Sequence, residues 1–247
     1  MIPPPSPFVM PPALVPASTA AVPAVATVSQ VPPPAAGARP PGDDPQADRV
    51  ILLPTAYTHP KGTVFVSNYD IALLQAGYAM TDQTQISVSA VPPLGGEGIA
   101  FFDLTLKTAL AGGGLVRAAA LGSVTGGVGN DIGTLLLGRI GGVVQLCMTP
   151  NCGSGFTLSS NGVLAGPVLL MVNGVGGTLR VGRRVSLLAE VEFLVPIGRE
   201  GNQWNGAAVG GGVRFHFSHW GFDLALLRTA RGKDALPLLT VTYRSAP

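Results

Sequence analysis

Hydrophobic and polar residues alternate along most of the chain after about residue 62. In the segment SLLAEVEFLVP (186–196), Glu190 and Glu192 are two residues apart in an otherwise apolar run. On a helix these two side chains would point about 200° apart, whereas on a strand they share one face and Ala189 and Val191 share the other. The segment is therefore predicted to be a strand with one acidic face and one apolar face.

The same alternation recurs elsewhere, with polar or small residues on one face and apolar residues on the other. Asp103 and Lys107, for example, alternate with Leu104 and Leu106. Alternation of period two is weak in a single segment, but its repetition is typical of transmembrane β-barrels. Turn-rich stretches, alternately short and long, separate the runs, as in an up-and-down barrel. The further alternating segments are 84–91, 101–110, 115–124 and 205–217.

Eleven strands are predicted from these patterns, whereas a bacterial single-chain barrel has an even number. Either 154–181 is one strand, which gives ten, or the segment RVILLPTAY (49–57) adds a twelfth. The predicted fold class is all-β, an antiparallel up-and-down transmembrane β-barrel of 10–12 strands in residues 48–247. The eleven ranges are 63–79, 83–91, 100–110, 115–124, 133–147, 154–162, 168–181, 184–195, 205–217, 221–228 and 236–244.

Composition favours a membrane protein over a soluble one. Charged residues make up 11% of the chain and hydrophobic residues 47%, whereas typical soluble proteins are about 25% charged. A soluble domain needs more charged surface than this chain offers, while a surface in contact with lipid does not. The formal net charge is +2, and no basic run interleaved with aromatic residues suggests nucleic acid as a partner.

Residues 1–47 differ in texture from the rest, because they hold 14 of the 23 prolines. Proline fixes φ and removes a hydrogen-bond donor, so this Pro/Ala-rich lead is predicted to be disordered, with polyproline II character. It lacks the basic start of an export signal. Two interpretations stay open: the true start lies elsewhere and the export signal is missing or degraded, or the segment is a periplasmic or surface linker.

A barrel in lipid requires its charged side chains to face the lumen, since each charge facing the bilayer midplane costs up to about 2–4 kcal/mol. The inward set holds four acids and four bases. One interpretation is a charge-paired interior that stabilises the barrel. The other is a narrow pore or ligand channel whose lining charges select what passes. The eight residues are Asp103, Lys107, Arg117, Arg139, Glu190, Glu192, Arg214 and Asp223.

Glycines at inward positions, such as Gly206, Gly210 and Gly212, have two interpretations. They relieve crowding where large inward residues lie opposite, or they allow the sheet to curl shut. Their surroundings lack the Lys-Ser/Thr pair and the strand-to-helix context of a nucleotide loop. No cofactor is therefore expected.

The two cysteines, Cys147 and Cys152, flank a turn in the sequence CMTPNC. A disulfide across the end of a hairpin is predicted, and it would indicate an oxidising compartment. Two free thiols and half of a metal site are the alternatives. Because the chain has no other cysteine and only three histidines, a structural zinc site lacks ligands.

One stretch resembles the first hairpin of many uncharacterised bacterial outer-membrane β-barrel proteins. It is KGTVFVSNYDIALLQAGYAMTDQTQISVSAV (61–91), and RRVSLLAEVEFLVPIG and GGVRFHFSHWGFDLAL resemble closing hairpins of the same group. The resemblance implies the outer membrane of a Gram-negative bacterium, a porin-like or structural role, and no catalytic residue. Membrane lipid, the outer-membrane assembly machinery and small solutes are the partners it implies. Residues expected at the membrane interfaces are Phe65, Tyr69, Tyr78, Phe193, Trp204, Phe217 and Trp220.

Two other functions are open. In a lipid-modifying hydrolase, His216 would take a proton from Ser218, two residues away, while Asp223 or Glu192 orients the imidazole. In a soluble, secreted, lipocalin-like binding barrel, the apolar face would lie inside and the charges outside. The exposure of the charged residues to solvent discriminates the soluble barrel from the transmembrane one.

Overall fold

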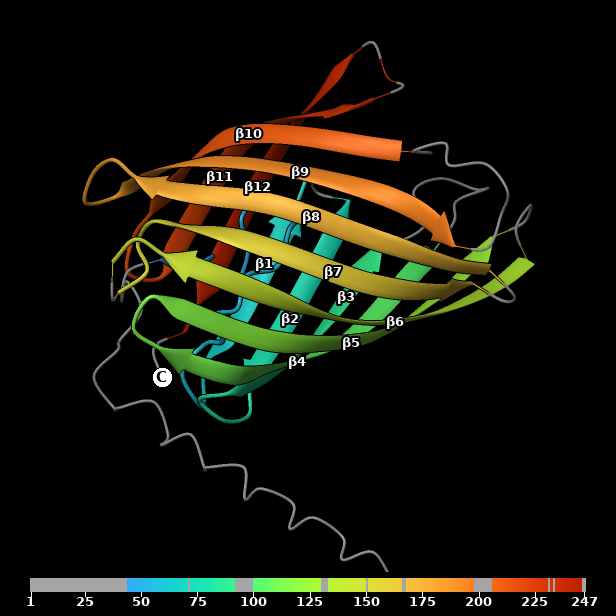
Figure 1. Ribbon diagram of the computed structural model, residues 1–247, viewed down its shortest axis with the longest axis horizontal. Coiled ribbons are helices and arrows are strands. Elements are labelled where there is room, and N and C mark those ends of the chain that lie inside the picture. The colour runs from blue at the N-terminus through green and yellow to red at the C-terminus, as the bar shows by residue number, and fades with distance from the viewer. Residues whose placement is uncertain are drawn as a thin grey trace, which may run out of the picture. The chain divides into compact units, whose positions relative to one another are not determined.

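The computed structural model describes most of the chain after residue 43, and its fold is a closed barrel of twelve antiparallel strands (Figure 1). The predicted all-β fold is confirmed. Within the described residues there is no helix with the length and apolarity that crossing a membrane requires. The described residues are 44–70, 72–91, 100–129, 133–149, 151–165, 168–197, 206–230, 232 and 234–245.

The strands follow one another around the barrel in chain order. They are β1 (Val64–Tyr69), β2 (Leu73–Ala79), β3 (Thr84–Val91), β4 (Ala100–Gly113), β5 (Val116–Gly129), β6 (Gly133–Cys147), β7 (Gly155–Ala165), β8 (Val168–Arg180), β9 (Val185–Ile197), β10 (Gly206–His216), β11 (Trp220–Thr229) and β12 (Ala235–Arg244).

The barrel closes between its first and last strands. Ser67 on β1 lies opposite Thr242 on β12 and opposite Gln75 on β2. Every strand therefore has two hydrogen-bonded neighbours, and no sheet edge is left unpaired. A closed sheet satisfies its own backbone groups, which is the condition for crossing the hydrocarbon part of a bilayer with strands.

The twelfth strand does not come from the segment 49–57, so that alternative was wrong. The predicted strand 63–79 is instead a hairpin, β1 and β2, and 154–181 is two strands, β7 and β8. The chain turns after Tyr69 because Asp70 adopts a left-handed conformation with φ of 50°. Aspartate tolerates this conformation better than most residues, and its carboxylate accepts a hydrogen bond from the Leu239 amide, 2.6 Å away.

The two faces of the sheet have the predicted sidedness. Glu190 and Lys107 are 4% and 3% exposed, whereas the adjacent residues Val191 and Leu106 are 39% and 46% exposed. The apolar face is thus outside and the charged face inside, the reverse of a soluble binding barrel. This sidedness removes the lipocalin-like alternative and makes the protein a transmembrane β-barrel.

The barrel has two distinct ends. At one end, which we call the turn end, β1 begins, β12 finishes, and the strands are joined through 80–83, 114–115, 148–154, 181–184 and 217–219. At the other end, which we call the loop end, they are joined through 70–72, 92–99, 130–132, 166–167, 198–205 and 230–234. The two longest connections, 92–99 and 198–205, belong to the loop end. Since outer-membrane barrels place their long loops outside the cell, the turn end is expected on the periplasmic side.

Exposed aromatic side chains gather at the turn end. The Trp220 ring lies 5.0 Å from the Tyr243 ring and 6.5 Å from the Phe222 ring. Such a group suits a membrane interface. Two of the predicted interface residues, Phe65 and Tyr69, are instead buried in the lumen, because they occupy inward positions of β1. Trp204 lies outside the described residues.

Candidate functional site: a plug inside the lumen

Residues 44–60, which we call the plug, fold inside the barrel. The plug is blue in Figure 1 and runs within the ring of strands. Its centre is a short hairpin in which the Val50 amide donates to the Leu53 carbonyl, 2.8 Å away, and the Thr55 amide donates to the Asp48 carbonyl, 2.9 Å away. Arg49 and Pro54 form an isolated bridge across it.

Both ends of the plug lie at the turn end. At its beginning, the Gln46 side chain packs on Gly221, which follows the 217–219 turn. At its finish, the Thr58 hydroxyl donates to the Asp82 carbonyl and the Lys61 amide donates to the Asp82 carboxylate, both 2.9 Å away. The plug is therefore a tongue that enters the lumen from the turn end and returns to it.

The plug changes the domain picture drawn from the sequence. Asp44 and Gln46, which the sequence analysis placed in the disordered lead, are buried inside the barrel. Residues 1–43 lie outside the described residues, so disorder there stays a prediction. The segment 49–57 reads as a strand because it is apolar, but Pro54 and the turn at residues 51–52 shape it as a tongue tip.

Apolar side chains anchor the tip of the plug in the wall. Val50, Ile51 and Leu53 are at most 1% exposed and pack with Leu188 and Ala225. Complete burial of such a side chain stabilises a fold by about 1.5–3 kcal/mol. The anchoring therefore contributes several kcal/mol to holding the plug in the lumen.

Inward glycines make room for these anchors. A Cβ on Gly174 would lie 2.1 Å from Leu53 Cδ1, and a Cβ on Gly210 would lie 3.1 Å from Ile51 Cδ1. Of the two interpretations from the sequence, relief of crowding fits these positions. The large residues they accommodate belong to the plug as well as to neighbouring strands.

Glu190 binds the main chain of the plug. Its carboxylate accepts hydrogen bonds from the amides of Ile51, Leu52 and Leu53, at distances of 2.9 to 3.1 Å. Three successive amides that converge on one anion form a favourable site for negative charge. The acidic face noticed in the sequence thus serves to hold the tip of the plug.

Arg214 is buried between the wall and the plug. Its guanidinium donates two hydrogen bonds to the Asp223 carboxylate, at 2.8 and 2.9 Å, and a third to Asp44, at 3.3 Å. Bidentate pairs of this kind combine charge with geometric specificity. The same guanidinium also donates to the plug carbonyls of Gln46, Arg49 and Val50.

Two further cations complete the attachment. Lys107 donates from β4 to the plug carbonyls of Asp48 and Thr55, at 3.2 and 3.5 Å. From the plug, the Arg49 guanidinium donates to Ser67 and Thr242 at 3.1 and 2.6 Å. It also lies 4.9 Å from the centre of the Tyr69 ring, which explains why that aromatic residue faces inward.

The structure thus brings four of the eight predicted lumen charges to the plug. Arg214 and Asp223 pair with each other, while Glu190 and Lys107 bind plug backbone. Asp103 accepts from the hydroxyls of Thr105 and Thr125, at 2.5 and 2.7 Å. The others also lie on the inner face, with Arg117 buried and Arg139 and Glu192 half-buried. Sequence reasoning missed Asp44, Asp48 and Arg49, because nothing local marks a tongue for a distant wall.

Buried titratable groups lie at the base of the plug. Burial lowers the pKa of His59 to about 4, against the opposing charge of Asp48. Burial raises the pKa of Asp48, but the charges on Arg49 and Lys107, together with that of His59 once it is protonated in acid, outweigh it and lower that pKa to about 2. His59 is therefore neutral and Asp48 ionised at neutral pH.

Several plug side chains are buried without complete hydrogen bonding. Among the described residues, the side-chain amide of Gln46, the hydroxyl of Tyr57 and both ring nitrogens of His59 have no hydrogen-bond partner. Buried polar atoms without partners cost free energy.

A cavity of about 410 Å³ lies between the plug and the loop end. Leu52 and Pro54, at the tip of the plug, line it on one side. The wall of the cavity comes mainly from β3, β4 and β5, where hydroxyl and amide side chains alternate with the outward apolar residues. Its size is within the range of small-molecule sites.

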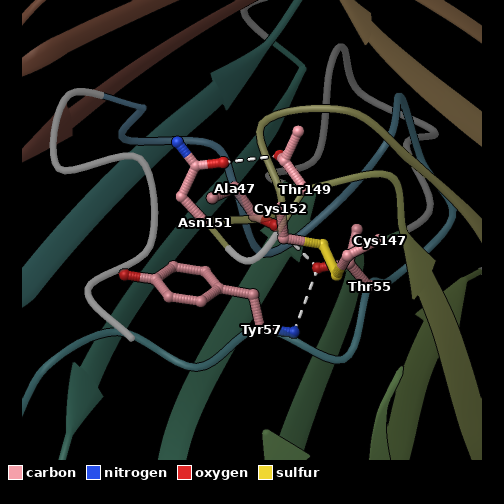
Figure 2. Close-up of a disulfide and its surroundings, with 7 residues drawn as sticks. All are labelled: Ala47, Thr55, Tyr57, Cys147, Thr149, Asn151 and Cys152. Carbon is pink, nitrogen blue, oxygen red and sulfur yellow. Dashed lines mark hydrogen bonds between the residues drawn. A yellow bond between two sulfur atoms is a disulfide. The ribbon is translucent and has the colours of Figure 1, made fainter. Parts of the chain in front are cut away.

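A disulfide joins Cys147 and Cys152 in the β6–β7 connection. Figure 2 shows it with Ala47, Thr55 and Tyr57 of the plug in its surroundings. The Thr55 hydroxyl donates to the Ala47 carbonyl, 2.6 Å away, and accepts from the Tyr57 amide, 3.2 Å away. The disulfide thus fixes the turn beside the base of the plug.

The residues of the hydrolase hypothesis lie in different surroundings. His216 is buried in the lumen, whereas Ser218 is exposed in the β10–β11 turn. Asp223, a candidate to orient the imidazole, is engaged by Arg214 with both carboxylate oxygens. In the part of the chain that the structure describes, no group of three His, Cys, Asp or Glu side chains is suited to a metal ion.

The fold has solved counterparts, although no protein-family model and no curated protein matches the sequence. A KdgM porin in complex with disordered oligogalacturonate is 7% identical, with a TM-score of 0.53 over 75% of this chain and 98% of that one. A KdgM porin without that ligand is 8% identical, with a TM-score of 0.50 over the same shares. LpxR from Salmonella typhimurium is 12% identical, with a TM-score of 0.48 over 74% of this chain and 99% of LpxR.

The fold is the closed barrel that the KdgM porin also has. The two KdgM structures support the fold, while the inward charges and the plug are properties of this chain.

Proposed function

We propose that the protein is a narrow-channel, porin-like barrel of the Gram-negative outer membrane, and that the plug keeps it closed. One observation carries this proposal: the wall is complete without the plug. All twelve strands are bonded to one another, whereas the plug is held by side chains. It is therefore able to leave the lumen without breaking the barrel, and small solutes are the expected cargo.

A structural barrel with a permanently filled lumen is the second candidate. The apolar anchors of the plug and its bonds to Arg214 favour this alternative. The closure of the wall by its own strands, which needs no bond to the plug backbone, favours the channel. The two functions differ in one measurable property, which is whether an ion current appears when the plug is loosened.

Conductance in planar bilayers tests the proposal. Glu190→Gln removes the charge that binds three plug amides, and we expect it to raise the open probability at least tenfold over the wild type. Asp234→Asn removes the same charge from an exposed residue and serves as the matched control. If neither the wild type nor Glu190→Gln produces an ion current in the bilayer, the channel proposal fails and the structural role remains.

A reversible lock gives an independent test. Leu53→Cys with Gly174→Cys places two thiols where Leu53 Cδ1 now meets Gly174. We expect the oxidised variant to be silent and the reduced one to conduct. The parent protein under the same reductant controls for the native disulfide of Cys147 and Cys152.

A further inference from the structure

The wall recognises the plug through its main chain. Glu190 accepts from three successive plug amides, and Arg214 donates to three plug carbonyls. Lys107 donates to two more carbonyls. Peptide groups are the same in every sequence. These contacts therefore recognise a peptide backbone and tolerate different side chains.

The wall also provides space for apolar side chains beside these charged groups. Gly174 and Gly176 lie against Leu53, and Gly210 lies against Ile51. Leu188 and Ala225 complete the apolar surface. The site therefore combines recognition of a backbone with small pockets for aliphatic side chains.

Departure of the plug leaves these charges in need of new partners. Glu190 and Arg214 are 4% and 1% exposed with the plug in place, and without it water or a ligand replaces the plug amides and carbonyls that they bind. A second peptide supplies amides to Glu190, carbonyls to Arg214 and aliphatic groups to the glycine pockets. A sugar supplies hydroxyl groups but no aliphatic side chains.

We infer that the lumen is a binding site for short apolar peptides, and that the plug occupies it as an internal ligand. This inference rests on the proposed channel function, since a solute reaches the site only when the plug moves. The cavity that Leu52 and Pro54 line lies against the tip of the plug. A peptide entering there meets the tip of the plug first and competes for the same groups.

Block of the ion current tests the inference in the full-length chain. Leu53→Ser loosens the plug and leaves every wall residue intact, and Ile51→Ser is the second variant if the first does not fold. The probe is the blocked peptide acetyl-Ala-Leu-Leu-Ala-amide, added from the loop side. We expect block that rises with peptide concentration, and at least tenfold weaker block when Glu190→Gln is added to the same background.

Two matched probes test whether block depends on the peptide backbone. The same peptide with N-methylated leucine amides loses two successive donors to Glu190, and we expect it to block at least tenfold more weakly. Maltotriose, a sugar of similar size, is expected to give no block. A conducting variant in which the methylated peptide or the sugar blocks equally well overturns the peptide site and leaves the channel. A variant that folds and never conducts overturns both.

Discussion

At the scale of single residues, the wall uses buried charge to hold another segment of the chain. Arg214 is the centre of this arrangement, since it binds Asp223, Asp44 and three carbonyls at once. Loss of one member of a buried pair leaves the other uncompensated, which costs about 3–5 kcal/mol. The charges predicted from strand alternation therefore matter for the plug as much as for the wall.

Replacement of Arg214 tests this coupling. Arg214→Met is expected to lower the free energy of unfolding by about 3–5 kcal/mol, because Asp223 and Asp44 lose their partner. The double variant Arg214→Met, Asp223→Leu should lose less than the single variant. Urea unfolding in detergent or vesicles measures both, and additive losses would show that the two residues are not coupled.

Acid should weaken the fold through His59. Its pKa is lowered by burial to about 4, against about 6.5 in an unfolded chain. The unfolded state then binds the extra proton between these values, so stability is complete above pH 6.5 and falls by up to about 3 kcal/mol as the pH approaches 4. Unfolding free energies across this range measure it, and His59→Gln should flatten that part of the profile.

At the scale of elements, the plug depends on glycines that face it. A Cβ on Gly174 meets Leu53, whereas a Cβ on Gly138 meets nothing within 4 Å. The same change, glycine to alanine, therefore has different consequences on β8 and β6. The space that glycines leave in the wall decides whether the plug fits.

Gly174→Ala is expected to cost about 1–3 kcal/mol of stability by overpacking, and to raise the open probability of the channel. Gly138→Ala serves as its control and should change neither. Leu53→Ala in the Gly174→Ala background should recover part of the loss. Equal effects of the two alanine variants would mean that the contact with the plug carries little energy.

The sequence predicts the strands better than it predicts the plug, and the reason is physical. Glu190 and Glu192 reveal a strand because the alternation of a strand is local. The segment 49–57 has the same apolar texture, but its fate depends on Glu190 and Arg214, more than a hundred residues away. Phe65 and Tyr69 were misplaced for a related reason, since their partners His59 and Arg49 belong to the plug.

At the scale of the whole molecule, sidedness explains the low charge content of the chain. The exposed outer face carries leucine, valine and isoleucine, and the charged side chains of the described strands are buried or half-buried except Arg228. Lipid then takes the place that water takes around a soluble domain. The depth of a residue in the bilayer should therefore decide the cost of a charge on that face.

Two variants on one strand test this depth dependence. Ile140 lies in the middle of β6 and Leu146 lies near its turn end, both exposed on the outer face. Ile140→Arg is expected to cost about 2–4 kcal/mol and Leu146→Arg about 0–1 kcal/mol. Unfolding in lipid vesicles measures both, and the reverse order would contradict the membrane assignment.

The position of Arg49 has a consequence for the assembly of the barrel. Its guanidinium donates hydrogen bonds to Ser67 on β1 and to Thr242 on β12. It therefore bridges the two strands that close the barrel. The segment that fills the hole thus also fastens the two edges that must find each other last. Arg49→Ala should slow the appearance of the compact, heat-modifiable band during insertion into vesicles, whereas Arg228→Ala, exposed on β11, should not. The plug therefore both fills the lumen and holds the first and last strands together.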